Sequence, residues 1–316
     1  MLVGLSGCDP LALGFRNEMR QRDSREGLAL GYIDGSLMQI VPLGGGLLGD
    51  ENLENYSGPC RACPGWFSPD GKLIVWVVVW PALQPGEPSL VVRRITGETM
   101  MTWTGQFNTI VALALAPDKS HVALEVQNYY PGVPDTGLQY VVLGTPNRVM
   151  IEGMPPQKEA DASDSLGWSP DSRKLVFSRH HKIIVLNIET GDRGAIADGS
   201  EPAWSPDGHW ISFTSPGGMA MLVDPSNRRT MTLYGGRKIT GPIARAPDSC
   251  CVSFSDNNRS LTDVVMFSQG RVVVYRIADG AWYVLRRFGA DGGTSYHFGW
   301  LYNYKEFLKH NNQLEK

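Results

Sequence analysis

The sequence has few charged residues and no long apolar run. Charged side chains make up 19% of the 316 residues, and 29 basic against 32 acidic residues leave a net charge of −3. Proteins that bind nucleic acid through its phosphates carry a basic surplus, so no nucleic-acid partner is indicated. The longest apolar stretch, Leu73 to Trp80, falls far below the roughly 18 residues that span a bilayer, and it predicts a buried strand.

The sequence also lacks the common catalytic motifs. No segment reads Gly-x-Ser-x-Gly, the nucleophile turn of α/β-hydrolases. The run Gly44-Gly45-Gly46 is followed by neither Lys-Ser/Thr nor an expected helix, so it does not form a phosphate loop. We therefore predict no catalytic residue, no cofactor and no metal ligand.

Glycine and proline are abundant, with 36 and 21 residues, and five of the prolines belong to an internal repeat. Five segments share Ser/Ala-Pro-Asp-Gly/Ser/Lys, preceded by an apolar residue in four of them and by Arg245 in the fifth, and each precedes a β-rich run. They are residues 66–71, 114–119, 167–172, 203–208 and 244–249. Their prolines, at 69, 117, 170, 206 and 247, are 48, 53, 36 and 41 residues apart. This spacing is typical of four-stranded β-propeller blades.

The repeated segment has the chemistry of a tight turn. Proline fixes φ at the second position, aspartate bonds back to the local backbone, and glycine tolerates a positive φ. Asp70, Asp171 and Asp207 are therefore expected to shape turns and not to catalyse or bind metal.

The two chain ends supply the remaining strands. Residues 297–302 lie where a sixth blade would open, and residues 31–41 resemble middle strands without an inner strand. If the C-terminal segment pairs with the N-terminal strands, one shared blade closes the ring and leaves no free sheet edge. We predict an all-β protein with six four-stranded antiparallel blades, with five or seven as alternatives. Residues 28–304 would form the propeller, between an N-terminal leader remnant and tether (1–27) and a polar C-terminal tail (305–316).

The best-formed unit begins at Trp168 and resembles the TolB-type propeller repeat, a relative of the WD-repeat blade. The resemblance implies a scaffold, usually extracytoplasmic, that binds partners. It does not extend to TolB proper, because the α/β domain that precedes that propeller has no counterpart in residues 1–27. Because a fold alone does not give a function, partner contacts are not transferred.

The N-terminus suggests a lipid anchor. Leu5-Ser6-Gly7-Cys8 resembles a bacterial lipoprotein box, in which the cysteine is lipidated after cleavage. The preceding segment is too short for a secretory signal and lacks a basic region, so either the leader is truncated here or the match is due to chance. Residues 9–26 fit an extended tether, with a short surface helix over Phe15 to Arg22 as the other possibility.

The remaining cysteines form two close pairs. Cys60 and Cys63 are spaced as C-x-x-C, and Pro64 stands where haem attachment would need histidine. A local Cys60–Cys63 disulfide and free buried thiols both fit. Cys250 and Cys251 are adjacent, and on a strand they would point to opposite faces, which argues against a shared tetrahedral metal site. An even number of cysteines besides Cys8 agrees with an oxidising compartment.

Two long loops are candidates for partner binding. They contain Trp80, and Tyr129 with Tyr130, and both are rich in proline. The loops are expected to follow the inner strands of adjacent blades and to emerge on one face. Rigid aromatic loops on a fixed scaffold suit recognition of another protein, although these loops could instead pack on each other.

Together these patterns predict a non-catalytic protein-binding scaffold of the bacterial cell envelope, anchored by lipid at Cys8 if the lipobox is real. The partner would be a protein, or cell-wall or glycan material. An enzyme that uses the central channel, such as a sugar lyase or hydrolase, is the alternative, because His121, His209 and His297 lie near the openings of inner strands. A peripheral subunit of a membrane complex is the third possibility.

Overall fold

The structure is a computed structural model of the whole chain. It describes residues 10–34, 37–43, 48–52, 65–68, 72–78, 89–94, 98–104, 109–127, 137–142, 148–153, 165–234, 239–257, 270–287, 297–301 and 304. Within these residues the chain forms a helix, α1 (Pro10–Glu26), followed by 24 strands. Every strand pairing is antiparallel, and the strands group into six four-stranded sheets.

Three sheets come from the first half of the chain and its C-terminal strand, and each runs from an inner to an outer strand. The first contains β24 (His297–Leu301), β1 (Ala29–Asp34), β2 (Leu37–Pro42) and β3 (Leu48–Asn52). The second contains β4 (Gly65–Phe67), β5 (Leu73–Val78), β6 (Ser89–Arg94) and β7 (Thr99–Thr104). The third contains β8 (Thr109–Leu115), β9 (His121–Gln127), β10 (Gly137–Val142) and β11 (Arg148–Gly153).

The second half of the chain forms three further sheets in the same order. The fourth contains β12 (Leu166–Trp168), β13 (Lys174–Arg179), β14 (Lys182–Asn187) and β15 (Arg193–Asp198). The fifth contains β16 (Ser200–Trp204), β17 (Ile211–Thr214), β18 (Ala220–Val223) and β19 (Thr230–Tyr234). The sixth contains β20 (Ile239–Arg245), β21 (Cys251–Asn257), β22 (Gly270–Arg276) and β23 (Trp282–Arg287).

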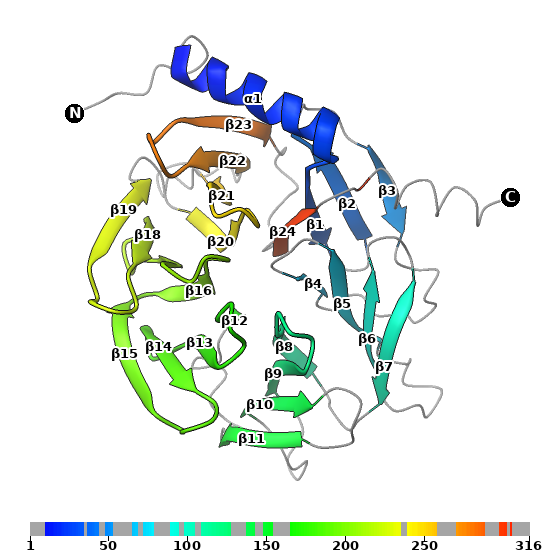
Figure 1. Cartoon of the computed structure of the whole chain (residues 1–316), viewed down its shortest axis with the longest axis vertical. Helices are drawn as coiled ribbons and strands as arrows, with labels where there is room; N and C mark the ends of the chain where they lie inside the picture. Colours follow the sequence, from blue (N-terminus) through cyan, green and yellow to red (C-terminus); the bar gives the residue numbers. More distant parts are fainter. Residues whose placement is uncertain are drawn as a thin grey trace, which may run out of the picture.

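The sheets are arranged around a common centre (Figure 1). The inner strand of each sheet contacts the inner strands of both neighbouring sheets. A radial set of four-stranded antiparallel sheets is a β-propeller. Strands from the two ends of the described chain share one sheet, in which Leu30 of β1 is paired with Trp300 of β24.

The repeated motif forms a tight turn between the first two strands of its sheet. In the fourth sheet the Ser169 N–H donates to the Lys174 carbonyl, and the Ser172 N–H donates to the Ser169 carbonyl. The turn needs a left-handed residue after the aspartate, and Ser172 adopts φ 60° there. Gly208 and Lys119 adopt φ 75° and 63° at the equivalent positions.

The core lies between neighbouring sheets. Leu175 and Phe177 of β13 are fully buried and pack with Ala112 and Leu138 of the third sheet. One charged pair interrupts this apolar packing. The buried Arg179 guanidinium donates to both carboxylate oxygens of Glu125 in the third sheet, at 2.8 and 2.9 Å.

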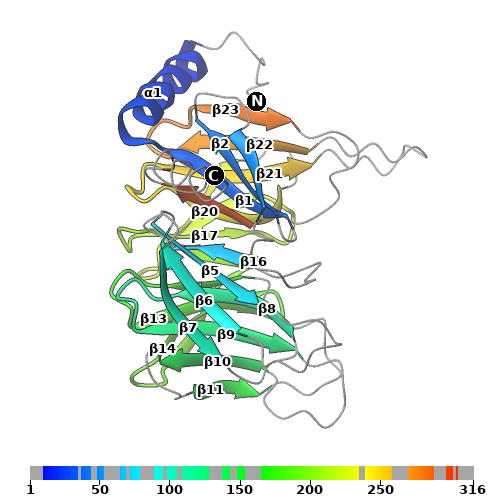
Figure 2. The same cartoon turned by 90° about the vertical axis from the view of Figure 1, so that its right-hand side faces the viewer.

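Helix α1 covers the outer strand of the sixth sheet (Figures 1 and 2). Phe15 and Met19, one turn apart, are buried against that sheet, and the Phe15 ring meets the Tyr283 ring of β23 edge to face. Gly27, at φ 60°, ends the helix with a hydrogen bond to the Asp23 carbonyl. Residues 10–26 are therefore a docked helix and not the expected extended tether.

Candidate functional site

Repeated turns from five sheets meet at one mouth of the propeller and enclose a cavity. Its volume is about 220 Å³. Each of the five motif-bearing sheets contributes residues, so the repeat itself builds the site. The lining residues are Ser68, Leu73, Leu115, Ala116, Pro117, Lys119, Trp168, Pro170, Trp204, Ser205, Pro206 and Pro247.

The cavity wall is rigid and mostly apolar. Its prolines have a fixed φ, and its two indole rings are held by the inner strands. The Trp168 Nε1–H donates to the Ala114 carbonyl of the preceding sheet at 2.9 Å, which fixes the orientation of that ring. A partner group that enters this cavity therefore meets a surface already in place.

Lys119 is the one charged residue among those that line the cavity. It stands where the other motif copies carry glycine or serine, and its side chain is exposed. Its backbone has the left-handed conformation of this turn position, at φ 63°. An exposed ammonium group beside apolar walls suits a partner that brings a carboxylate next to an apolar group.

The motif aspartates are held by their own turns. The Asp171 Oδ1 atom accepts hydrogen bonds from the Ser169 hydroxyl at 2.5 Å and from the Arg173 N–H at 3.1 Å. The Ser169 hydrogen bond is the main cause that lowers the pKa of Asp171 below its usual value. At Asp207, burial acts to raise the pKa, but hydrogen bonds from Ser205 and the His209 N–H outweigh it. Both aspartates thus have the turn-forming contacts that were expected of them.

A serine, a histidine and an aspartate also come together beside the mouth. The Ser120 hydroxyl donates to Asp118 Oδ1 and lies 2.5 Å from His121 Nδ1. In a hydrolytic triad the histidine lies between the serine and the carboxylate, so that it can take the serine proton. Here the serine lies between the other two and its proton faces the carboxylate. The arrangement therefore stabilises the turn and does not activate a nucleophile.

Arg245 is an irregular member of the repeat. It occupies the position of Trp168 and Trp204, just before the turn, and is 7% exposed. None of its side-chain nitrogens has a hydrogen-bond partner within the described residues. Burial lowers the pKa of Arg245 to about 10, although the Asp207 carboxylate acts in the opposite direction.

The candidate lipid, disulfide and partner-binding residues singled out from the sequence cannot be compared with this cavity. Cys8, Cys60, Cys63, Trp80, Tyr129 and Tyr130 are all outside the described residues. Strands β5 and β9, which precede the two aromatic segments in the chain, begin next to motif turns and run away from them. Sequence reasoning missed the cavity, although a proline at the same turn of five blades was the signal that could have located it.

The structure pairs Cys250 with Cys251, whose redox state the sequence left open. Their sulfur atoms are joined in a disulfide between adjacent residues. Cys250 lies in the turn before β21, and only Cys251 lies on the strand, so the alternation of side chains along a strand does not apply to this pair.

The described part of the chain shows neither a metal cluster nor a membrane-spanning helix. Within it no three His, Cys, Asp or Glu side chains are grouped so that they could hold a metal ion. Helix α1 lacks the length and the apolar character that crossing a bilayer requires, and no other described helix has them.

The comparisons with known proteins identify the fold. No protein-family model matches the chain, and no curated protein matches its sequence. The structure is similar to a protein assigned as TolB from Agrobacterium tumefaciens, with a TM-score of 0.54 and 15% identity over 87% of this chain and 98% of that chain. It is also similar to TolB from Acinetobacter baumannii, with a TM-score of 0.56 and 12% identity over 95% of this chain and 74% of that chain. At these identities the likeness shows a TolB-like propeller fold.

Proposed function

We propose that this chain is a non-catalytic, protein-binding propeller of the bacterial cell envelope, with six blades closed by the pairing of β1 with β24. The cavity at the motif turns carries the proposal. The six described sheets and the contacts between their inner strands support the blade count and the closure. The TolB-like fold and the even number of cysteines besides Cys8 support a place outside the cytoplasm.

The size of the cavity favours a segment of a partner protein over a free metabolite. At about 220 Å³ it is smaller than the roughly 300–1,000 Å³ typical of pockets for whole small ligands. It can take one or two side chains of an extended segment. Proline and tryptophan walls fit apolar side chains, and Lys119 fits a neighbouring carboxylate. We infer that the partner presents an apolar or proline residue beside an acidic one.

Lipid attachment at Cys8 is part of the same proposal. The four residues Leu5 to Cys8 support it, and the docked helix that starts at Pro10 would hold the propeller close to the anchored residue. The intact mass of the native protein from fractionated cells tests this assignment. A mature chain that begins at Cys8 with added acyl mass is expected, and an unmodified Met1 in the soluble fraction contradicts it.

The cavity is tested with peptides selected against the wild-type protein from a displayed library of unstructured sequences. We expect selected peptides to carry an acidic residue beside an apolar one. Lys119→Glu should weaken the affinity of these peptides by about tenfold or more, because it places two negative charges together. Lys119→Gly removes the charge and keeps the turn, since Gly208 has the same conformation in the fifth sheet. It should weaken binding by a few-fold.

Lys182→Gln is the matched control. Lys182 is also exposed, but it is the first residue of β14 and pairs with Arg179 at the end of β13, far from the motif turn at which β13 begins. It should leave the affinity unchanged. Equal affinity of wild type and Lys119→Glu would show that the cavity is not the binding site. The aromatic loops would then be the remaining candidate, and alanine at Trp80, Tyr129 and Tyr130 would test them.

A further inference from the structure

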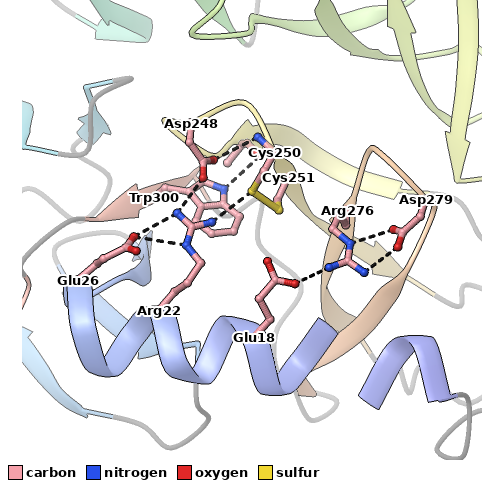
Figure 3. Close-up of a disulfide and its surroundings, with 10 residues drawn as sticks. Glu18, Arg22, Glu26, Asp248, Cys250, Cys251, Arg276, Asp279 and Trp300 are labelled. Carbon is pink, nitrogen blue, oxygen red and sulfur yellow. Dashed lines mark hydrogen bonds and ion pairs between the residues drawn. A yellow bond between two sulfur atoms is a disulfide. The ribbon is translucent and has the colours of Figure 1, made fainter. Parts of the chain in front are cut away.

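The disulfide between Cys250 and Cys251 lies where α1 meets the sixth sheet (Figure 3). Cys251 is 1% exposed and belongs to the apolar cluster that contains Phe15, Met19 and Trp300. Cys250 is only partly buried and lies on the side of the helix. Both cysteines pack against the same apolar cluster, but Cys251 is fully enclosed in it, whereas Cys250 is partly exposed and its sulfur has a charged neighbour.

A bond between adjacent residues does little as a structural cross-link. A disulfide stabilises a fold mainly by closing a loop of the unfolded chain, and the effect grows with the length of the loop. Here the loop consists of the two cysteines themselves, and both belong to one turn and strand start. The elements around the bond are already joined by strand pairing and by the packing of α1. The presence of the Cys250–Cys251 bond therefore needs an explanation other than cross-linking of the fold.

Arg22 of α1 supplies a positive charge to one of the two sulfurs. Its Nη1 atom donates to Cys250 Sγ at 3.4 Å, and its Nη2 atom pairs with Asp248 Oδ2 at 2.8 Å and with Glu26. These contacts aim the guanidinium at the sulfur, and the arginine side chain is 13% exposed. A cation beside a cysteine favours its thiolate, which is the reactive form in thiol–disulfide exchange.

We propose that Cys250–Cys251 is a thiol–disulfide exchange site, in which a dithiol reductant reacts at Cys250 and Arg22 stabilises the Cys250 thiolate. A thiolate of the reductant attacks Cys250 Sγ, the Cys250–Cys251 bond breaks, and its electron pair goes to the Cys251 sulfur, which takes a proton. The second thiolate of the reductant then attacks its own bound sulfur and releases Cys250 as a thiolate beside Arg22. The dithiol is oxidised to a cyclic disulfide and loses two electrons to the protein.

The role of each cysteine follows from its surroundings. Cys251 leaves into the apolar cluster, where burial disfavours a thiolate, so it becomes a neutral thiol. Cys250 remains charged next to Arg22 and is the nucleophile when the bond forms again. Arg22 is a positioning residue for this chemistry, because it acts on the sulfur and does not itself exchange electrons. The proposal does not depend on what binds in the cavity.

The experiment alkylates the cysteines of the full-length protein and measures the mass of one tryptic peptide. Cleavage after Arg245 and Arg259 yields residues 246–259, which contain Cys250 and Cys251 and no other cysteine. We expect this peptide to resist alkylation in the native protein and to take up two alkyl groups after treatment with dithiothreitol. Fragment masses then distinguish the two sulfurs and give the rate at each as a function of pH.

In the reduced wild-type protein, alkylation of Cys250 should reach its midpoint at a lower pH than alkylation of Cys251. Arg22→Gln should raise the Cys250 midpoint by about one pH unit, and Arg22→Lys should restore most of the shift. Arg25→Gln is the matched control, because Arg25 lies on the same helix, is 72% exposed and pairs with Glu26. In Arg25→Gln, the pH midpoints for alkylation of Cys250 and Cys251 should equal those of the wild type.

Three results would overturn the proposal. Alkylation of both cysteines in native protein without reductant would show that the bond is absent. Equal midpoints for Cys250 and Cys251 in the wild type would show that the surroundings do not distinguish them. An equal shift in Arg22→Gln and Arg25→Gln would show that helix charge in general is responsible, and not the contact at Cys250. The second result is obtained on the wild type, so it stands even if a variant fails to fold.

Discussion

The fourth and sixth sheets carry the same motif and differ in what surrounds it. Both turns have the same backbone hydrogen bonds, from Ser169 to Lys174 in one and from Ala246 to Cys251 in the other. In the fourth sheet the motif is complete, with a buried tryptophan and a serine. In the sixth, arginine replaces the tryptophan and alanine replaces the serine.

In the sixth sheet, helix α1 supplies a contact that the motif serine makes in the fourth sheet. Ser169 donates to Asp171 inside its own turn. Asp248, without such a serine, pairs with Arg22 of α1 instead. Strand β15 leaves most of its residues exposed, while the outer strand β23 packs under Phe15. Side chains of a repeat can thus diverge where an element outside the repeat supplies the missing contacts.

Replacing the buried arginine should give the largest effect. Arg245→Met removes a buried cation that has no hydrogen-bond partner within the described residues, and it keeps most of the side-chain volume. The lowered pKa of Arg245 corresponds to a cost of about 3 kcal/mol in the charged form. We expect the variant to be more stable by about 1–3 kcal/mol in urea unfolding at pH 7. Arg245→Lys, which keeps a charge, should show no gain.

The stability difference between wild type and Arg245→Met should also depend on pH, and the sign of that dependence can be derived. The pKa of Arg245 is about 10 in the folded protein, well below its ordinary value in the unfolded chain. Between these values the unfolded chain holds more protons, so the stability of the wild type rises relative to the variant as the pH increases. The advantage of Arg245→Met should therefore be constant below about pH 9 and shrink above about pH 10. An advantage that is flat up to about pH 11 would contradict the assignment to Arg245.

Two single substitutions at the motif serine position, Ser169→Ala and Ala246→Ser, should give the smallest changes in stability, with opposite signs. Ser169→Ala removes hydrogen bonds to Asp171 and to the Lys174 N–H, and it should cost about 1–2 kcal/mol. Ala246→Ser restores a hydroxyl to a turn whose aspartate is already paired with α1, so it should gain less than about 1 kcal/mol. Thermal unfolding of both variants measures the difference. A loss with Ala246→Ser would mean that the sixth sheet no longer accommodates the motif.

The sequence predicted best what depends on local chemistry. Proline, aspartate and a left-handed residue at fixed spacing are sufficient to form the motif turn, so the all-β propeller fold and the structural role of Asp171 could be inferred from residues alone. The spacing of the turns also indicated the size of the repeating unit. The TolB-like neighbours support this part of the interpretation.

What depends on long-range contact could not be predicted. The segment of α1 shows little amphipathic pattern, because Leu11 and Leu13 are exposed and only Phe15 and Met19 are buried. The cavity is assembled from five distant turns, and no single segment marks it. The sequence left the redox state of Cys250 and Cys251 open, because the pattern does not show that Cys250 belongs to the turn and only Cys251 to the strand.

The pairing of β1 with β24 has a consequence for synthesis of the chain. β1 is among the first strands to leave the ribosome, and its inner partner, residues 297–301, is the last strand described. Until that segment emerges, one edge of β1 has no hydrogen-bonding neighbour, and unpaired strand edges promote aggregation of nascent chains. Docking of α1 meets almost the same delay, since β23 is the strand that directly precedes β24. We therefore expect the nascent chain to be most open to edge-to-edge association between synthesis of β1 and synthesis of β24.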